Sequence, residues 1–345
     1  INALKDKADV TPINEWVYGR GWNHDYFIDE KRFPNRYDLD KVSKDHTVFA
    51  TRCCGHIASV NSKALEIIGL LDKGIDIEGG EVEVDENGIP TGVFKENAIG
   101  YVQNFRPGNI KEYVKNFIIL GAKCLNSYGV TSCQSDDLLS LPNVDYHTIL
   151  EAFKELSDDN KLTVRVNEQA QFEKPDFFNN FFNEGYYPNW GNQYFKIGPL
   201  KVVAEASLGA RTAYMSRPYH DDPSTCGLPI YTAKQFDEMF KIARDHNMSI
   251  AVHCIGDGIL DRVLDSYEKT IDFNDDHRCG LVHLQISRVE QLKRIAKMKL
   301  HAYVQSIFLD YDSKIVYDRV GDLANSSYAF KTLHDLNVCI SNGSD

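Results

Sequence analysis

The sequence contains no hydrophobic run of membrane-spanning length, and its longest apolar pieces are as short as NFIILGA at 116–122. A transmembrane helix needs about 20 consecutive apolar residues, and no secretion signal is visible. Basic residues are also in the minority, because 38 Lys and Arg face 50 Asp and Glu and give a formal net charge of -12. This balance disfavours nucleic acids and membranes as partners. These absences predict a soluble protein.

Cys-x-x-Cys pairs are also absent, which argues against a disulfide framework or a redox motif of that kind. The cysteines are irregularly spaced and mostly lie in apolar runs, so we expect reduced, buried thiols in a cytoplasmic protein. The eight of them are at positions 53, 54, 124, 133, 226, 254, 279 and 339.

What the sequence does contain is a regular alternation of apolar strand-like runs and amphipathic helical patterns. In one such helical pattern, Phe236, Phe240, Ile242 and Ala243 form an apolar stripe, and Thr232 can cap its start. This alternation is typical of a parallel sheet covered by helices. It predicts an α/β fold, a TIM-like (β/α)8 barrel whose first strand is missing from the front of the chain. The seven predicted strands lie in 129–136, 162–170, 194–206, 249–257, 279–285, 300–308 and 337–345.

Residues 1–110 do not follow this alternation. Within them, GGEVEVDENGIPTGVF predicts a hairpin in which Val82 and Val84 alternate with acids and Asn87-Gly88 supplies positive φ angles. We therefore expect a small inserted α+β subdomain over 1–110 and barrel strands two to eight over 111–345. A second irregular piece, 172–195, is dense in aromatic residues. It is interpreted either as a lid or as rings packed against the barrel's flank.

Two histidines and one aspartate stand at the C-terminal ends of predicted strands: His253, His283 and Asp345. Each has an ordinary interpretation, as a hydrogen-bonded core histidine or a helix-capping aspartate. All three, however, fall at the same end of separate β/α units, where parallel α/β folds build their active sites. Two imidazoles and a carboxylate can bind one divalent cation, so the pattern predicts a hydrolytic metal site.

Several motifs occur in the order found in the amidohydrolase superfamily. They resemble most closely the branch that includes the N-substituted formamide deformylases, amidohydrolase family 3. The resemblance covers essentially the whole chain. Its motifs are WVYGRGWNHD, RCCGHIASVNSKAL, GIPTGVFKENA, LGARTAYMSRPY, AVHCIGDGILDRVLD, LVHLQ and NGSD.

The resemblance implies a metal-dependent hydrolase that attacks an amide or related C–N bond of a small-molecule substrate with an activated water. His253 and His283 match the metal-binding histidines of strands five and six. Asp345 matches the aspartate that contacts the metal and takes the proton from the water. Lys201 matches the carboxylated lysine that bridges two metals; its alternative is a buried lysine paired with Glu205, four residues along one strand face. One or two divalent cations are implied, with zinc preferred.

Two departures from the family pattern stand out. Related sequences carry Asp-Gly where this chain has Glu205-Ala206, and the His-x-His motif of strand one is absent, since no two of the eleven histidines are spaced two apart. The chain also begins at Ile1 without Met and ends directly after a strand. We therefore expect a metal-poor, inactive piece of a longer polypeptide that lacks strand one and the terminal β-sandwich.

Three further residues are candidates for substrate binding. His56 can polarise a carbonyl or be a surface turn residue, and Arg211 can bind a carboxylate or form a structural salt bridge. Gln305, at the end of the seventh strand, can hydrogen-bond substrate or a water near the metal. Because fold does not fix reaction, two alternative functions stay open: a non-catalytic barrel that binds or regulates, and a deaminase or isomerase using the same metal site. A homo-oligomer is compatible with the sequence.

Overall fold

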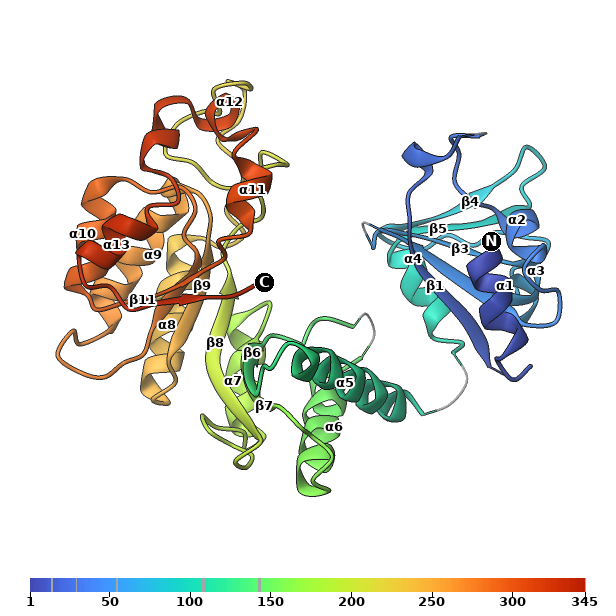
Figure 1. The fold of residues 1–345 in the computed structure, drawn as a ribbon, viewed down its shortest axis with the longest axis horizontal. Helices are drawn as coiled ribbons and strands as arrows, with labels where there is room; N and C mark the ends of the chain where they lie inside the picture. The colour runs from blue at the N-terminus through green and yellow to red at the C-terminus, as the bar shows by residue number, and fades with distance from the viewer. Residues whose placement is uncertain (14, 29, 54, 107–108, 142–143, 345) are drawn as a thin grey trace. The chain divides into compact units, whose positions relative to one another are not determined.

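The computed structural model describes residues 1–13, 15–28, 30–53, 55–106, 109–141 and 144–344. The chain forms two compact units, Ile1–Glu112 and Tyr113–Asp345 (Figure 1), and each is described by itself. No described helix combines the length and apolar character that crossing a membrane requires.

The first unit is built on a five-stranded mixed sheet with the order β1-β2-β3-β5-β4. β1 and β2 are parallel, and the other neighbours are antiparallel. Its core gathers Trp16, Phe49, Val60, Leu65 and Phe94. The elements are α1 Asn2–Asp9, β1 Trp16–Trp22, the 3-10 helix His24–Tyr26, α2 Arg36–Asp40, β2 Thr47–Arg52, β3 Ile57–Val60, α3 Ser62–Ile67, β4 Gly80–Val84, β5 Pro90–Glu96 and α4 Asn97–Gln103.

The predicted hairpin is confirmed as β4 and β5, which pair antiparallel. Gly88 has φ 79°, whereas Asn87 is not among the residues with positive φ, so the expectation for Asn87 is wrong. The reason is a longer turn in which the Asp85 carboxylate accepts hydrogen bonds from the backbone N–H groups of Asn87 and Ile89, both at 2.9 Å. This side-chain-supported turn needs only one residue in the left-handed region.

The second unit is built on a seven-stranded sheet, ordered β12-β11-β10-β9-β8-β7-β6, in which every neighbouring pair is parallel. Each strand overlaps one of the seven predicted runs, so that prediction is confirmed. The strands are β6 Ser132–Ser135, β7 Arg165–Gln171, β8 Phe195–Val203, β9 Ile250–Cys254, β10 Gly280–His283, β11 His301–Val304 and β12 Ile340–Asn342. The helices are α5 Ile110–Ser127, α6 Tyr146–Asp158, α7 Pro175–Asn183, α8 Ala233–Asp245, α9 Asp257–Thr270, α10 Val289–Lys297, α11 Phe308–Asp312, α12 Val316–Val320 and α13 Phe330–Asp335, with a 3-10 helix at Gly321–Ser326.

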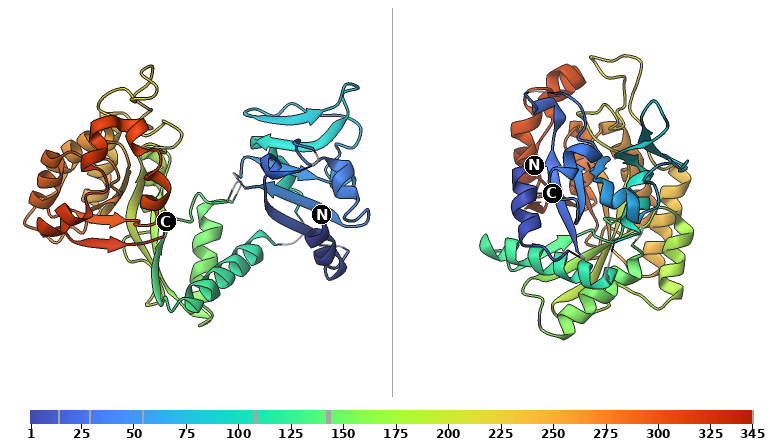
Figure 2. Two further views of the ribbon diagram at one scale, coloured as in Figure 1. Left: turned by 45° about the horizontal axis from the view of Figure 1, so that its top comes forward. Right: turned by 90° about the vertical axis from the view of Figure 1, so that its right-hand side faces the viewer.

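Strands that follow one another in the sequence are neighbours in this sheet, and the sheet is curled. Figure 1 and the left view of Figure 2 show α8, α9, α10 and α13 on one side of it. This half-barrel arrangement fits a TIM-like fold. Within the described residues β6 and β12 are the two edges, and closure by an eighth strand stays a prediction.

Helix α8 shows how the sequence pattern becomes packing. Thr232 caps its N-terminus and forms a capping box with Gln235, as its position predicts, which contributes about 1 kcal/mol. Phe236, Phe240 and Ala243 are fully buried against the sheet. The stripe therefore faces the core as expected.

The aromatic segment 172–195 packs several of its rings into the core of the second unit, and those rings do not form a lid. Phe172, Phe178 and Phe181 are buried in the core of the second unit, and the ring centroids of Phe172 and Phe178 lie 5.3 Å apart. The structure supports the interpretation of rings packed on the flank, and the lid interpretation is wrong for these three rings.

The described cysteines are unbonded thiols, and Cys54 lies outside the described residues. Burial is confirmed for Cys254 and Cys279 but is wrong for Cys53, Cys124 and Cys339, which are exposed. Cys124 lies on the outer surface of a helix instead of in a strand, and Cys339 precedes an edge strand, so neither is covered by a helix layer.

Candidate metal centre

The two predicted histidine ligands lie side by side at the C-terminal ends of neighbouring strands. His253 is the penultimate residue of β9 and His283 the last residue of β10, and the register pairs Val282 with His253. Their ring centroids are 4.4 Å apart at an interplanar angle of 75°. The parallel sheet therefore brings together two imidazoles that are 30 residues apart in the sequence.

The backbone at His283 has an unusual conformation. His283 has φ 71° and Leu284 has φ 50°, both in the left-handed region that non-glycine residues rarely adopt. The N–H of Leu284 donates to the carbonyl of Cys254 at 2.8 Å and to that of Val282 at 3.0 Å, the second contact closing a γ-turn around His283. Such strain costs about 1–3 kcal/mol per residue and concentrates at functional sites. No glycine marks this turn, so no residue in the sequence indicates it.

His283 is held as a neutral imidazole. It is 5% exposed, and burial lowers its pKa from 6.5 to about 4. Its Nδ1–H donates to Oε1 of Gln305 at 2.8 Å, while Nε2 of Gln305 donates to the carbonyl of Tyr303 at 3.2 Å. Because the amide nitrogen of Gln305 is used by Tyr303, its oxygen faces the histidine and fixes the tautomer. In this tautomer Nε2 of His283 carries the lone pair, as a metal ligand requires.

His253 presents its other nitrogen. Nε2 of His253 lies 3.0 Å from the carbonyl oxygen of Ala206, which only accepts, so Nε2 is the nitrogen that carries the proton. When the ring is neutral, its lone pair belongs to Nδ1. The two rings are thus oriented by separate hydrogen bonds.

Lys201, on β8, stands beside this pair. Its ammonium group donates to Oδ2 of Asp136 at 2.6 Å, and its side chain is buried. The charge of Lys201 also lowers the pKa of His283, and that of Asp136 raises it, so both groups act on the histidine. Asp136 was not predicted as a site residue, although it ends the strand run 129–136 in the same manner as the chosen residues.

The alternative pairing of Lys201 with Glu205 is wrong. β8 ends at Val203, so the alternation of a strand does not continue to position 205. The fully buried Glu205 carboxylate instead accepts hydrogen bonds from the backbone N–H groups of Tyr214, Ile255 and Gly256. Burial raises the pKa of Glu205 to about 7. This carboxylate joins the loop after β8 to the loop after β9, next to His253.

Three further predicted site residues, Arg211, His56 and Gln305, have protein partners. Arg211 forms a two-point ion pair with Asp221, at 3.1 and 2.9 Å, as the structural interpretation expects. In the first unit, Nδ1 of His56 lies 2.8 Å from Oε2 of Glu96, and both side chains are exposed. Gln305 contacts His283, and substrate binding by these three residues stays a prediction. Asp345 lies outside the described residues.

The described residues fit part of a metal centre. They contain no group of three or more His, Cys, Asp and Glu side chains arranged to hold an ion. The two oriented imidazoles of His253 and His283 are nevertheless suited to two ligand positions of a divalent cation. The donor chemistry present therefore fits a divalent cation, and its identity as zinc stays a prediction.

The chain belongs to the amidohydrolase family, whose sequence profile matches residues 1–345, in agreement with the resemblance to amidohydrolase family 3. It is 30% identical over 346 residues to "Putative amidohydrolase YtcJ" of Bacillus subtilis (strain 168), covering 100% of this chain and 64% of that protein. It is 24% identical over 313 residues to the N-substituted formamide deformylase of Arthrobacter pascens, covering 83% of this chain and 53% of that protein.

Solved structures of two uncharacterized metal-dependent hydrolases are similar. The one from Pyrococcus horikoshii OT3 has a TM-score of 0.76 at 26% identity, covering 99% of this chain and 64% of that chain. The one from Pyrococcus furiosus has a TM-score of 0.77 at 26% identity, covering 100% and 66%. The chain thus spans less than two thirds of the length of these relatives. Family and structural likeness together favour a metal-dependent hydrolase.

Proposed function

We propose that the full-length protein is a metal-dependent hydrolase that cleaves an amide or related C–N bond in a small molecule. The observation that carries this proposal is the pair of imidazoles at the ends of β9 and β10, centroids 4.4 Å apart. Core packing alone does not require two adjacent histidines with separate orienting hydrogen bonds. Ligand binding does, because each ring must present an unprotonated nitrogen in a fixed direction.

Each site residue has a separate proposed role in metal binding or proton transfer. Nε2 of His283 and Nδ1 of His253 would hold one or two divalent cations, with zinc preferred, and Asp345 would add a carboxylate and accept the proton of the attacking water. A divalent cation at this position polarises the substrate carbonyl and makes water more acidic. The low pKa of His283 keeps its ring neutral across the physiological range, so binding does not first require deprotonation.

The choice of a C–N bond is supported by two relatives, one named a putative amidohydrolase and the other an N-substituted formamide deformylase. Lys201 supports a carbonyl substrate in a second way, because a buried cation on the strand next to that of His253 can stabilise negative charge that develops on the carbonyl oxygen. In this role Lys201 remains an ammonium; the carboxylated bridge is the competing role.

The test uses the full-length protein, purified without added chelator. Elemental analysis should find at least one equivalent of divalent metal per chain, and hydrolysis of a panel of N-acyl and N-formyl amides should release amine. Removal of metal by a chelator should abolish the release, and one divalent cation should restore it. A metal-free protein that releases no amine would instead support the non-catalytic barrel, and amine-free turnover of the panel would support an isomerase.

A further inference from the structure

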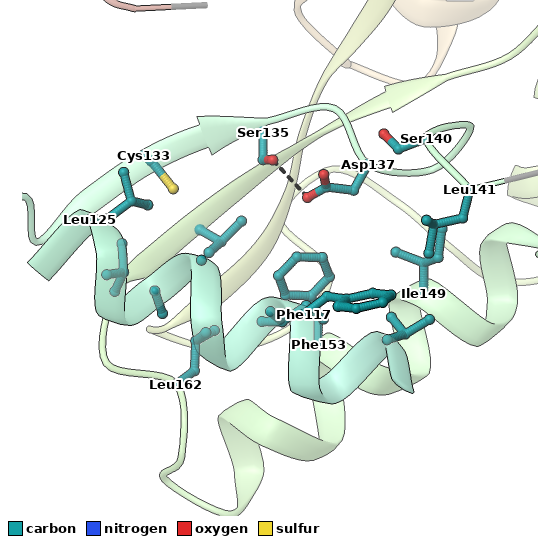
Figure 3. A pocket seen from close by; sticks show the side chains of 16 residues that line it. Phe117, Leu125, Cys133, Ser135, Asp137, Ser140, Leu141, Ile149, Phe153 and Leu162 are labelled. Carbon is teal, nitrogen blue, oxygen red and sulfur yellow. Dashed lines mark hydrogen bonds between the residues drawn. The ribbon is translucent and has the colours of Figure 1, made fainter. Parts of the chain in front are cut away.

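A cavity lies on the helix-facing side of β6 and β7, away from the histidines. It has a volume of about 250 Å³, is lined mainly by α5, α6 and the two strands, and is open to solvent on one side (Figure 3). Its walls are largely apolar and include Phe117, Leu125, Ile149, Phe153 and Val166. A cavity of about 150 Å³ with such walls holds a benzene molecule, and drug-sized ligands need about 300 Å³ or more. The space here therefore suits one aromatic ring with a short chain.

Polar groups gather along one side of this cavity. Figure 3 shows Ser135 and Asp137 joined by a hydrogen bond, in which the Ser135 hydroxyl donates to Oδ2 of Asp137 at 2.6 Å. A carboxylate has about four acceptor positions, so one hydroxyl leaves acceptor capacity on Asp137. Burial raises the pKa of Asp137, which shows that the protein compensates its charge poorly.

Glu168 adds a second acid behind Asp137. It lies two residues from Val166 on β7 and is fully buried, and its Oε1 accepts the backbone N–H of Asp137 at 2.7 Å. Its other oxygen, Oε2, is buried without a hydrogen-bond partner among the described residues. Among the residues that the structure describes, neither Asp137 nor Glu168 takes part in a salt bridge. A half-buried and a fully buried carboxyl group without a cationic partner favour a ligand that brings a positive charge.

We propose that this cavity binds a small organic ammonium ion, with an aromatic or alkyl body between α5 and α6 and its ammonium group on Asp137. The apolar walls supply the burial energy for the body, at about 25 cal/mol per Å². The ammonium group supplies the positively charged partner that Asp137 and Glu168 lack within the protein. The inference does not rest on the proposed hydrolysis, because the cavity lies on the other side of the sheet from the histidine pair.

The experiment is a calorimetric titration of the full-length protein with 2-phenylethylammonium chloride at pH 7.5. Two comparators separate the parts of the ligand: 2-phenylethanol has the ring without the charge, and methylammonium has the charge without the ring. The variants are Asp137→Asn, which removes the charge at constant size, and Ala122→Leu, which fills the cavity from α5. Asp176→Asn, at an exposed position of α7, is the matched control.

We expect saturable binding of 2-phenylethylammonium that is weakened about tenfold or more by Asp137→Asn, because a hydrogen bond between charged groups is lost. Ala122→Leu should abolish the binding, and Asp176→Asn should leave it unchanged. If Ala122→Leu does not fold by circular dichroism, Gly121→Leu replaces it, since Gly121 lines the cavity and an added Cβ meets no atom within 4 Å.

Two results would overturn the proposal. Binding of 2-phenylethanol as tight as that of the ammonium, with no effect of Asp137→Asn, would show that the positive charge has no part. Binding of the ammonium that survives both Asp137→Asn and the filling variant, or no saturable binding at all, would show that this cavity is not the site.

Discussion

The ammonium group of Lys201 lies 2.6 Å from a carboxylate oxygen of Asp136, so an acid after β6 holds a buried lysine from β8. The pair joins two strands that are separated by β7 in the sheet. It also sets the charge near His283, since Lys201 lowers the pKa of that histidine. The electrostatics of the candidate metal centre thus depend on a residue that is not itself a predicted ligand.

Replacing Asp136 by Asn should destabilise the protein, because it leaves the buried Lys201 cation without a carboxylate. Breaking a fully buried pair costs about 3–5 kcal/mol, and the 43% exposure of the Asp136 side chain reduces our expectation to about 1–2 kcal/mol. Urea unfolding measures the change. Asp335→Asn, which breaks an exposed pair with Lys331, is the control and should cost less than about 0.5 kcal/mol. Equal, small losses for both would show that Lys201 does not need Asp136.

The same ion pair predicts that Lys201 remains an ammonium. A carboxylated lysine is an anion and would be repelled by Asp136 at this distance. Bicarbonate should therefore not change the rate or extent of metal reconstitution of the apo full-length protein. A dependence on bicarbonate that is lost in Lys201→Met would establish the carboxylated bridge instead.

Removing either imidazole should remove metal and activity together. In the full-length protein, His253→Ala and His283→Ala should each lower bound metal to a small fraction of the wild-type content, measured by elemental analysis. Asp345→Asn should reduce turnover more than metal content, because the amide can coordinate weakly but cannot accept a proton. His334→Ala, in an exposed position of α13, is the control. Unchanged metal content in both histidine variants would contradict the assignment of the site.

Gln305 should act through His283. Gln305→Leu removes the acceptor for the Nδ1–H of His283, and loss of such a partner typically weakens metal affinity 10- to 100-fold. Competition with a chelating dye measures the affinity, and Gln305→Glu, which retains an acceptor, should recover most of it. If both variants bind metal like the wild type, the hydrogen bond does not orient the ligand.

Glu205 should give the protein a pH-dependent stability. Its pKa is about 7 when folded and about 4.5 when unfolded, so the folded state binds the proton more tightly between these values. The stabilisation is fully present below pH 4.5 and is lost as the pH rises through 7, by at most about 3 kcal/mol. The unfolding free energy of the wild type relative to Glu205→Gln should fall over this window. A difference for Glu205→Gln that stays flat across this window would refute the raised pKa.

The sheet of the second unit was predictable because its signal is local. Apolar runs such as the one around Val252 and the capped stripe of α8 are written in consecutive residues, and parallel pairing in chain order then follows. The proximity of His253 and His283 also follows from parallel pairing in chain order, since each lies at the C-terminal end of one of two neighbouring strands. The ion pair of Lys201 was mispredicted because it depends on where β8 stops, and a single sequence gives strand ends only to within a few residues.

Features set by three-dimensional packing gave no sequence signal. The three backbone donors that surround Glu205 come from two loops, at Tyr214 and at Ile255 and Gly256, and loop paths are not encoded in periodicity. The cavity beside Asp137 arises from how far α5 stands from β6, which depends on the fit of many side chains.

The left-handed backbone at His283 and Leu284 has a consequence for anyone who wishes to make this protein more heat-resistant. The substitution Leu284→Gly relieves steric strain in the turn. Substitutions that convert the turn into regular strand would change the direction of the His283 imidazole. Selection for thermal tolerance alone would thus favour variants with an unstrained backbone at residues 283 and 284, in which the His283 imidazole no longer points toward the metal position. A library screened in this region needs a metal-binding readout beside the melting temperature, because the two properties oppose each other here.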